Sequence, residues 1–557
     1  MKRTIHSIIL VTLIAAFLIS SCATQEGDTG AAIHTSIFAK ASATPTIEPA
    51  ILWIDPAVPA SLEGKLLTQS SVQPSSARDS ASLFFEVTAS NQSMAVEVGS
   101  VMQVYALIAP FPTVTDGVTL DQLQRFWRGD EMGDFPFDHL QGSVETLDLF
   151  KKLWGEAAIG RVSEAGEETF KTNDFFQMRT WAIVPFDQIS PRWKVIKVNG
   201  ISPLDKPMDV DNYSLTVTYT MSVKSESEAL KAAATQLLAM LPVTNRDESK
   251  MTVLMMTGTT AMVRATAYKM ETKGLDYPIE KVLPWFENAD LIHVSNEISF
   301  NEDCPFPDYN QMDLRFCSSP DYLQTLKNLG VNVVELTGNH MNDYGAEHFV
   351  ETITTYASLG WTYFGGGFNA EEAKKPVTME VNGNKIAFIG CNTEGPIQDW
   401  ATDTMAGAAK CDMEYFTTQI AELKAEGYVV VSTLQAHEIY TEYVYINYNA
   451  QDFLDPALAG ADIVSGSQSH TPMSFQFVGN SLIHYGLGNF LFDNMTYEGL
   501  DADIQREFID RHIIYDGRYI STELLTARLA DWSQPNPMTE EDRADFLTEF
   551  FAKGNWK

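Results

Sequence analysis

The sequence predicts a mixed α/β protein, in which a smaller α/β domain precedes a larger domain of alternating strands and helices. Its length of 557 residues exceeds what one ordinary hydrophobic core supports, so two or three domains are expected. A hydrophobic content of 45%, with 11% aromatic residues, indicates folded domains rather than disorder. From Met251 onward, short apolar runs alternate with helical patterns, which is typical of βαβ units.

Residues 1–22 are predicted to be a signal peptide. Two basic residues precede an apolar run, Ile8–Ile19, and small residues then lead to Cys22. This pattern resembles a bacterial lipoprotein signal, which implies that a lipid on Cys22 anchors the exported protein to the outer face of the cell membrane. A plain secretory peptide or a single anchor helix is the alternative, although the run is short for a membrane span. Residues 23–50, rich in Thr, Ala, Ser and Gly, are predicted to form a flexible linker.

The charge balance excludes one class of partner. The chain has 38 basic and 73 acidic residues and a formal net charge of -35. Nucleic-acid binding requires a basic surface that neutralises phosphates, so a nucleic-acid partner is not expected. The same charge disfavours adsorption to anionic lipid.

Residues 51–241 are predicted to form the N-terminal α/β domain. Apolar runs predict strands at Val101–Ile108 and Leu215–Met221. Thr119 is placed to cap a helix whose apolar residues recur at helical spacing. A further helix, rich in Ala and Leu, is expected over Ser225–Leu241.

Two segments of this domain, Val114–Gly129 and Trp181–Gly200, resemble a lobe of periplasmic solute-binding proteins. The resemblance implies solute capture, and a structural spacer or a partner-docking domain is the alternative. The polar stretch Pro242–Lys250 is the expected boundary before the larger domain, which is predicted over residues 250–500. A helical extension is predicted over residues 501–557.

The larger domain is predicted from short strands that end in polar turns. Ser319 followed by Pro320 predicts a helix start, and Gly330 predicts its end. Asn382-Gly383 between two apolar runs predicts a hairpin with a type I′ turn. Strands are expected at Thr252–Met256, Leu291–Ser295, 331–336, Val377–Val381, Lys385–Ile389, Val429–Leu434, Asp462–Val464 and Leu482–Tyr485, and helices at Pro278–Asn288, 320–329 and 346–359.

Four cysteines remain besides Cys22, an even number that suits disulfides in an exported protein. Three pairings are possible, and the two local ones are expected: Cys304 with Cys317, and Cys391 with Cys411. Each would close a loop that follows a predicted strand. A zinc site made of all four cysteines is the alternative, but their wide spacing lacks paired CxxC motifs.

Polar groups able to bind a ligand or move a proton follow strand after strand in the larger domain. Loops at the carboxyl ends of strands line the ligand crevice in open α/β sheets, so these groups are expected to share one site. Carboxylates, amides and imidazoles are the groups that binuclear hydrolytic metal sites use. They occur in Thr257-Gly258-Thr259, Asn296-Glu297, Thr337-Gly338-Asn339-His340, Gln435-Ala436-His437-Glu438, Ser467-Gln468-Ser469-His470 and Gly488-Asn489.

Residues 251–494 carry a family resemblance. Five segments resemble, in order and spacing, the CapA family of capsule and poly-γ-glutamate synthesis proteins: SNEISF, GVNVVELTGNHMNDYG, YFGGGFNAEEAKKPVTMEVNGNKIAFIG, AGADIVSGSQSHTPM and LIHYGLGNFLFDN. The fold of that family is related to calcineurin-like metallophosphatases. The resemblance therefore implies a layered metallophosphatase-like (α/β/β/α) fold for the larger domain.

Three ligand positions of that family hold other residues in this chain. The family has Gly-Asp after its first strand, where this chain has Gly258-Thr259. A later family histidine falls at Gln435, and the first histidine of a Gly-His-x-His motif falls at Gln468. Two divalent cations need anionic ligands, and Glu297 is the one retained from the expected pair. A conventional two-metal centre is therefore not expected.

A single divalent cation, Mn, Zn or Fe, is one interpretation of the remaining residues. Its ligands would be Glu297, Asn339, His437 and His470. His437 could reach the place that Gln435 fails to fill, because residues two apart on a strand face the same way.

A pocket without metal is the other interpretation. Here Gln435, Gln468 and Asn339 would hydrogen-bond an amide-rich or sugar-like ligand, with Thr259 and Asn489 as further substrate-binding residues.

His340 has a separate role in the resemblance. In metallophosphatase-like sites the histidine after Asn serves as a general acid or transition-state donor, and Asp343 is placed to orient its ring. The alternative is a histidine that backbone carbonyls hold in the turn.

The lipoprotein signal and the CapA resemblance together imply a cell-surface protein that takes part in the synthesis or handling of a capsule or poly-γ-glutamate type polymer. Its expected partners are an anionic or amide-rich surface polymer and the membrane synthase of that polymer. As an enzyme it would be a metal-dependent hydrolase of metallophosphatase type with a reduced ligand set. A non-catalytic scaffold or binding lipoprotein, or solute capture through the N-terminal domain, is the alternative.

Overall fold

The computed structural model describes residues 50–68, 72–88, 95–133, 135–166, 179–436, 450–493 and 502–554. Pro49–Lys557 form one compact unit. The predicted signal peptide with Cys22, and the predicted linker up to residue 49, lie outside the described residues. Within the described ranges, no helix is long and apolar enough to cross a membrane.

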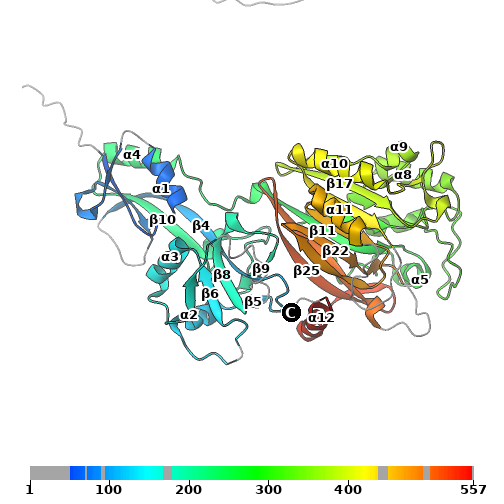
Figure 1. Cartoon of the computed structure of the whole chain (residues 1–557), viewed down its shortest axis with the longest axis horizontal. Helices are drawn as coiled ribbons and strands as arrows, with labels where there is room; N and C mark the ends of the chain where they lie inside the picture. The colour runs from blue at the N-terminus through cyan, green and yellow to red at the C-terminus, as the bar shows by residue number, and fades with distance from the viewer. Residues whose placement is uncertain are drawn as a thin grey trace, which may run out of the picture. The chain divides into compact units, whose positions relative to one another are not determined.

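One mixed sheet organises the chain before residue 250 (Figure 1). Its longest strand, β4, pairs with β10 through its first half and with β8 and β9 through its second half, so one strand joins both parts of the sheet. The predicted strand Val101–Ile108 lies within β4, and the predicted strand Leu215–Met221 overlaps β10. The order is β2 (Val72–Ser75), β1 (Ala50–Ile54), β3 (Leu83–Val87), β10 (Thr216–Val223), β4 (Val96–Pro110), β8 (Thr180–Pro185), β6 (His139–Gly142) and β7 (Val162–Glu164), with β9 (Trp193–Val198) on β4 and β5 (Gly117–Val118) on β9.

The predicted helix cap at Thr119 is confirmed. Its hydroxyl accepts a hydrogen bond from Gln122 N, and the Gln122 side chain accepts one from Thr119 N, which makes a capping box at the start of α2 (Leu120–Arg128). Gly129, with φ 87°, ends the helix. The helix predicted over Ser225–Leu241 is α4 (Glu228–Leu238), and the other helices of this region are α1 (Ala60–Leu67) and α3 (Val144–Trp154).

Two sheets face each other in the larger domain. One has the order β14 (Thr362–Phe364), β13 (Val333–Glu335), β12 (Leu291–Asn296), β11 (Met251–Thr260), β24 (Arg506–Tyr515), β25 (Arg518–Ala530) and β26 (Gln534–Pro537), with β23 (Asn489–Leu491) on β11. The other has the order β16 (Val377–Val381), β17 (Asn384–Asn392), β19 (Val429–Gln435), β20 (Ile463–Ser467), β22 (Ser481–Leu487) and β21 (Pro472–Val478).

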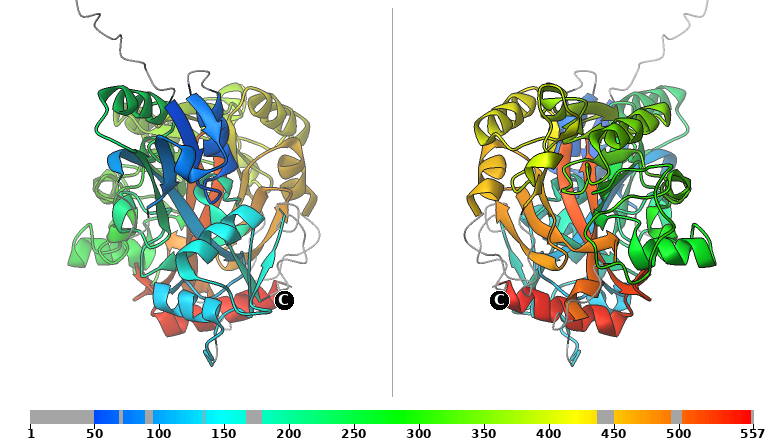
Figure 2. Two further views of the ribbon diagram at one scale, coloured as in Figure 1. Left: turned by 90° about the vertical axis from the view of Figure 1, so that its left-hand side faces the viewer. Right: turned by 90° about the vertical axis from the view of Figure 1, so that its right-hand side faces the viewer.

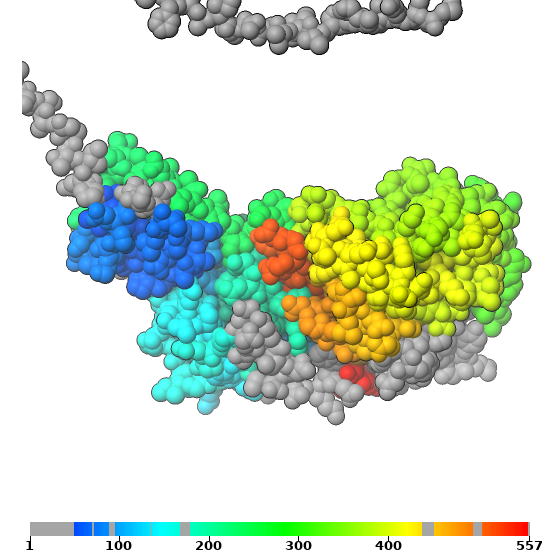
Figure 3. Space-filling model, turned by 45° about the horizontal axis from the view of Figure 1, so that its top comes forward, coloured from blue at the N-terminus to red at the C-terminus, as the bar shows by residue number. Residues whose placement is uncertain are grey.

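Alternate residues of each strand enter different cores, which confirms the predicted α/β/β/α layers. Val429 and Val431 of β19 lie in the core between the two sheets, together with Leu254 of β11. Val430 points the other way, into the core beneath α10 (Met413–Ala425) and α11 (Ala450–Ala459). These two helices cover the outer face of the second sheet, where they are yellow to orange (Figures 1 and 2), and they form part of the yellow to orange surface of Figure 3.

The outer face of the first sheet packs on helices in the same way. Val334 of β13 shares a core with Phe349 and Ile353 of α8 (Ala346–Ser358). The remaining helices of the domain are α5 (Arg264–Lys273), α6 (Leu283–Phe286), α7 (Leu323–Leu329) and α9 (Ala370–Ala373), and a two-stranded sheet joins β15 (Gly366–Gly367) to β18 (Gly407–Ala408).

The turn chemistry predicted for this domain is confirmed. Asn382 and Gly383 have φ of 51° and 75°, the two positive angles that a type I′ turn requires, and they join β16 to β17. Gly330, with φ 89°, ends α7.

Two predictions of helix are wrong. Over Pro278–Asn288 the structure has the four residues of α6, because Pro284 has no N–H with which to continue a longer helix and instead lies in the first turn of α6. Over residues 501–557, β24, β25 and β26 occupy most of the segment, and α12 (Glu540–Lys553) is its one long helix among the described residues. Asp516-Gly517, with φ of 49° and 77°, is a hairpin turn, and the β24–β25 hairpin completes the first sheet beside β11.

Candidate functional site

The predicted site residues of both sheets meet at the carboxyl ends of their strands. In the first sheet, β12 ends directly before Glu297, and β13 ends shortly before the turn that carries Asn339. In the second sheet, Gln435 is the last residue of β19 and Gln468 follows β20. The strands within each of these pairs run parallel, so their carboxyl ends share one edge. A hydrogen bond from Gln435 to Glu297 joins the two edges.

A cluster of side-chain amides and one carboxylate forms the centre of this site. Gln435 Nε2 donates to Glu297 Oε1 at 3.0 Å and to Asn339 Oδ1 at 3.3 Å, and it also contacts Gln468 Oε1. Ser467 Oγ donates to Gln435 Oε1 at 2.6 Å. Glu297, Gln435 and Gln468 are buried, so this amide cluster, Glu297, Asn339, Gln435 and Gln468, is largely desolvated. Three of its four members are neutral amides, so a ligand that reaches the cluster would contact mainly amide oxygens and amide N–H groups.

His470 lies in the same region but bonds to a different partner. Its Nδ1 contacts Asn489 Oδ1 at 2.7 Å, and Asn489 Nδ2 donates back to the His470 carbonyl at 3.3 Å. Burial lowers the pKa of His470 to about 4, against the opposing effect of Asn489, so the ring is neutral at physiological pH. Thr259 pairs with Asn489 in the β11–β23 ladder, which brings these predicted substrate-binding residues together.

His340 and Asp343 form a hydrogen-bonded pair, as the sequence predicts. His340 Nδ1 contacts Asp343 Oδ2 at 2.8 Å. Asp343 is itself held, because Phe316 N donates to Oδ2 at 2.8 Å and the Arg315 guanidinium donates to its carbonyl. The Phe316 ring packs edge-on against His340 with centroids 4.7 Å apart. The ring of His340 therefore has a fixed orientation, while its assignment as a general acid stays a prediction.

Both predicted disulfides are confirmed. Cys304 bonds to Cys317 and Cys391 bonds to Cys411. The first closes the loop that carries Arg315 and Phe316, so this bond helps to hold the backbone groups that position Asp343.

The carboxylates around His340 determine its protonation. Burial disfavours the charged ring, but the hydrogen bond and charge of Asp343 and the charges of Glu297 and Asp399 outweigh it and raise the pKa of His340 above its ordinary value of 6.5. His340 is therefore protonated to a higher pH than a free histidine. It can donate a charge-assisted hydrogen bond to an anionic or carbonyl oxygen.

Replacing Asp343 by asparagine is expected to lower the pKa of His340, because the largest opposing contribution to burial is removed. The measurement is a histidine-selective NMR titration of the full chain. Asp321→Asn, at an exposed position of the same domain, is the matched control and is expected to leave the titration of His340 unchanged. An unchanged or higher pKa in Asp343→Asn would contradict this account of the pair.

Two buried carboxylates, which the sequence analysis does not predict, also belong to the site. Glu335, the last residue of β13, accepts hydrogen bonds from Thr337 at 2.5 Å and from Ser467 at 3.2 Å. Burial raises the pKa of Glu335, but its contacts with His293 and Thr337 lower the pKa by more than burial raises it, so Glu335 stays ionised. Asp399 accepts from Asn342 N at 2.7 Å, and burial raises its pKa to about 7. Glu335 could have been found from the sequence, since a carboxylate inside an apolar strand needs buried partners.

The comparisons with known proteins agree with the predicted resemblance. Residues 253–494 match the family described as bacterial capsule synthesis protein PGA_cap. The match supports the CapA resemblance for that segment of the chain. The matched segment contains the amide cluster, the His340–Asp343 pair, His470 and both disulfides.

Curated relatives and a solved structure were also matched. The capsule biosynthesis protein CapA of Bacillus anthracis is 29% identical over 265 residues, which cover 46% of this chain and 63% of that protein. The PGA biosynthesis protein CapA of Bacillus subtilis (strain 168) is 28% identical over 230 residues, which cover 40% of this chain and 58% of that protein. The chain thus spans about six-tenths of the length of these relatives. A 5'-nucleotidase precursor from Thermus thermophilus aligns over 54% of this chain and 58% of its own, at 14% identity and a TM-score of 0.30.

The described residues of this PGA_cap segment do not fit a two-metal centre. Glu297 already accepts the N–H of Gln435, so an amide hydrogen points at the oxygen that a cation would need. Thr259 Oγ1 is buried without a hydrogen-bond partner in the described part of the chain, and a neutral hydroxyl is a poor cation ligand there. Across the described ranges, no three His, Cys, Asp or Glu residues are grouped to hold an ion. His437 lies outside these ranges, so the single-cation set with Glu297, Asn339 and His470 stays a prediction.

Proposed function

We propose that the protein binds a capsule-type polymer with amide and carboxylate groups, of poly-γ-glutamate character, during its synthesis or handling at the cell surface. The observation that carries this proposal is the PGA_cap match over residues 253–494, together with an amide cluster at the strand ends of that segment. The names of the curated relatives, which refer to capsule and PGA biosynthesis, support the same class of ligand.

The chemistry of the amide cluster suits such a polymer. Gln435, Gln468 and Asn339 each offer an acceptor oxygen and two N–H donors, which match the peptide-like groups of a γ-glutamyl chain. In the structure these amides satisfy one another, so a ligand amide could exchange for an internal partner without leaving a buried group unpaired. When protonated, His340 would donate to a carboxylate or carbonyl oxygen of the same chain.

The net charge of -35 limits how an anionic polymer is recognised. A strongly negative protein repels a polyanion over the screening length of the solvent. Recognition at this site therefore rests on close-range hydrogen bonds from the amides and from His340. Export, a lipid on Cys22 at the outer face of the cell membrane, and a membrane synthase as the neighbouring partner complete the proposal.

Cell-bound polymer is the measurement that tests this function. A strain that lacks the chain would be complemented with wild type, with Glu297→Ala/His340→Ala, or with His348→Ala. The double variant is expected to restore about tenfold less polymer or lower, since it loses charged hydrogen bonds at the site. His348→Ala removes a histidine paired with Glu351 on α8 and is expected to behave as wild type.

Immunoblots under non-reducing conditions would show that each variant is exported and oxidised. Full restoration of polymer by the double variant would overturn the proposal. Elemental mass spectrometry of the purified full chain, after growth in mixed divalent metals, separates the two forms of the site. Near-stoichiometric metal that disappears in Glu297→Ala would favour the single-cation form over the amide pocket.

A further inference from the structure

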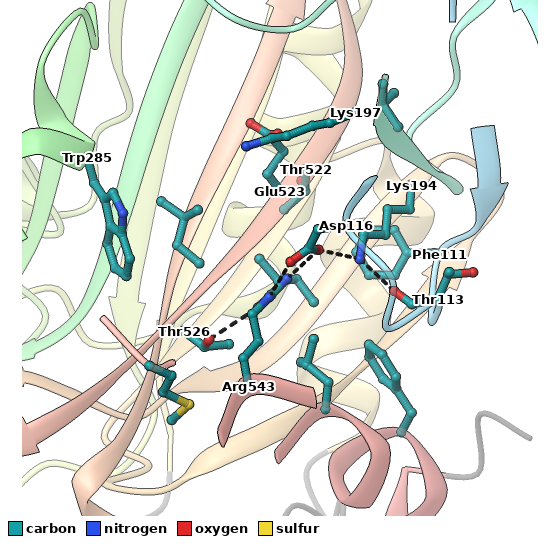
Figure 4. Close-up of a pocket in the computed structure, with 16 residues that line it drawn as sticks. Phe111, Thr113, Asp116, Lys194, Lys197, Trp285, Thr522, Glu523, Thr526 and Arg543 are labelled. Atoms are coloured by element: carbon teal, nitrogen blue, oxygen red, sulfur yellow. Dashed lines mark hydrogen bonds and ion pairs between the residues drawn. The ribbon is translucent and has the colours of Figure 1, made fainter. Parts of the chain in front are cut away.

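A cavity of about 200 Å³ lies away from the amide cluster, between β9 and β25. The loop after β4 and strand β9 form one side, and β25 with α12 forms the other (Figure 4). Three cationic residues, Lys194, Lys197 and Arg543, line it. This anion cavity is defined by those residues with Trp285 and the apolar side chains of Met538, Leu547 and Phe551.

One carboxylate inside the cavity is already committed to two of the cations. Arg543 donates from Nε and Nη2 to both oxygens of Asp116, at 2.7 and 3.0 Å. Lys194 Nζ lies 2.6 Å from Asp116 Oδ1 and also donates to two backbone carbonyls, of Thr113 and Val114. Burial raises the pKa of Asp116. The hydrogen bond from Arg543 and the charges of Lys194 and Arg543 outweigh this effect and hold that pKa well below its usual value. Asp116 therefore stays ionised and ties the two sides of the cavity together.

This arrangement leaves N–H groups of Arg543 and Lys197 without an anionic partner among the described residues. Arg543 has five N–H groups, and its contacts with Asp116 and Thr526 use three of them. Lys197 forms neither an ion pair nor a side-chain hydrogen bond with any residue of the described ranges. The other carboxylate of the cavity, Glu523, is paired with Arg511. A chain of net charge -35 thus concentrates unused positive charge at one cavity.

Apart from three threonines, the rest of the lining is apolar. The Trp285 indole lies across the cavity from Lys194 (Figure 4), and Met538, Leu547 and Phe551 also line the cavity. Small-molecule sites combine such apolar walls with a few convergent polar groups and are common between packed substructures. Cavities that hold drug-sized ligands measure roughly 300 to 1,000 Å³, so this cavity suits a smaller molecule.

We propose that the anion cavity binds a small organic carboxylate, whose charged group contacts Lys197 and the free N–H groups of Arg543 and whose body packs on Trp285. A carboxylate suits the donors better than a phosphate does. Phosphate sites usually add several backbone N–H groups from a helix start or glycine-rich loop, and the free donors here are side chains. The ligand is either a free organic acid or one unit of an anionic polymer. This inference does not depend on the amide cluster or on the proposed function.

Isothermal titration of the purified full chain at low salt tests the proposal. The probes are sodium glutamate, sodium glucuronate and a γ-glutamyl tripeptide, with glutamine amide, glucose and inorganic phosphate as comparisons. At least one carboxylate is expected to bind with one site per chain, and to bind more weakly as salt is raised. Equal affinity for monomer and tripeptide indicates a free acid as the ligand, and tighter binding of the tripeptide indicates a polymer unit.

Lys197→Ala is expected to weaken carboxylate binding by about tenfold or more, because a charged donor is lost. Lys224→Ala, which removes an exposed lysine elsewhere, is expected to bind as wild type. Trp285→Leu, which keeps the wall apolar, is expected to give an intermediate loss. Failure of all three carboxylates to bind, binding of phosphate alone, or equal binding by Lys197→Ala and wild type would each overturn the proposal. A matching unfolding temperature for Lys197→Ala and wild type shows that the loss is local.

Discussion

Replacing Gly338 by alanine is expected to destabilise the protein by about 3 kcal/mol or more and to abolish polymer restoration. A Cβ at this position would lie 2.5 Å from Glu297 Cα and 3.1 Å from the Glu297 carbonyl carbon. Backbone atoms cannot move aside as a flexible side chain can. Either the turn of residues 337–340 or the backbone at Glu297, directly after β12, must therefore shift. Asn339 and His340 follow Gly338 directly, and their contacts with Gln435 and Asp343 would be lost with that movement.

Urea unfolding of the full chain, followed by far-UV circular dichroism, measures the first effect, and cell-bound polymer measures the second. Gly64→Ala is the matched control. Gly64 lies inside α1, and a Cβ there has no atom within 4 Å. The same substitution is expected to stabilise that helix by about 0.5 to 1 kcal/mol. A Gly338→Ala protein as stable as wild type would show that the close approach to Glu297 is not required.

The layered fold was predictable because its strands are short, β-branched and bounded by glycine or polar turns. Val429–Leu434 and the Asn382-Gly383 hairpin were placed from local chemistry alone, since a type I′ turn needs two residues that tolerate positive φ. The β24–β25 hairpin carries the same kind of turn, Asp516-Gly517, and this dipeptide is the sequence signal for strands where a helical extension was predicted. Its strands also lack clean alternation, because both faces of this part of the sheet are buried and carry polar residues such as Asp510 and Glu507.

The site was predictable as far as strand order determines it. Parallel strands bring their carboxyl ends to one edge, so Glu297, Asn339 and Gln435 could be grouped without knowing the packing of the two sheets. Which amide bonds to which carboxylate could not be derived, because it depends on side-chain rotamers and on how the sheets face each other. The anion cavity was also out of reach, since Lys197 and Arg543 are far apart in sequence and neither belongs to a motif.

Restoring the family residues at three positions is expected to create a metal site. The triple variant Thr259→Asp/Gln435→His/Gln468→His returns one carboxylate and two imidazoles to the places where the CapA resemblance has them. The loss of a residue that only orients a metal ligand lowers metal affinity by about 10- to 100-fold. Three restored direct ligands are therefore expected to raise the metal affinity by roughly 1,000-fold or more. Elemental mass spectrometry and the dependence of the unfolding temperature on added Mn²⁺ or Zn²⁺ measure the change.

The same variant tests why the wild-type cluster is built from amides. Without metal, a buried Asp at position 259 lacks a cationic partner, so the triple variant is expected to unfold at a lower temperature than wild type and to recover when metal is added. Adding Glu297→Ala to the triple variant is expected to remove the bound metal, because Glu297 would bridge or anchor the ions. A triple variant that takes up no more metal than wild type would show that the amide cluster departs from a metal site in geometry as well as in residue type. Metal uptake with a lasting loss of polymer restoration would instead show that the amides themselves bind the polymer.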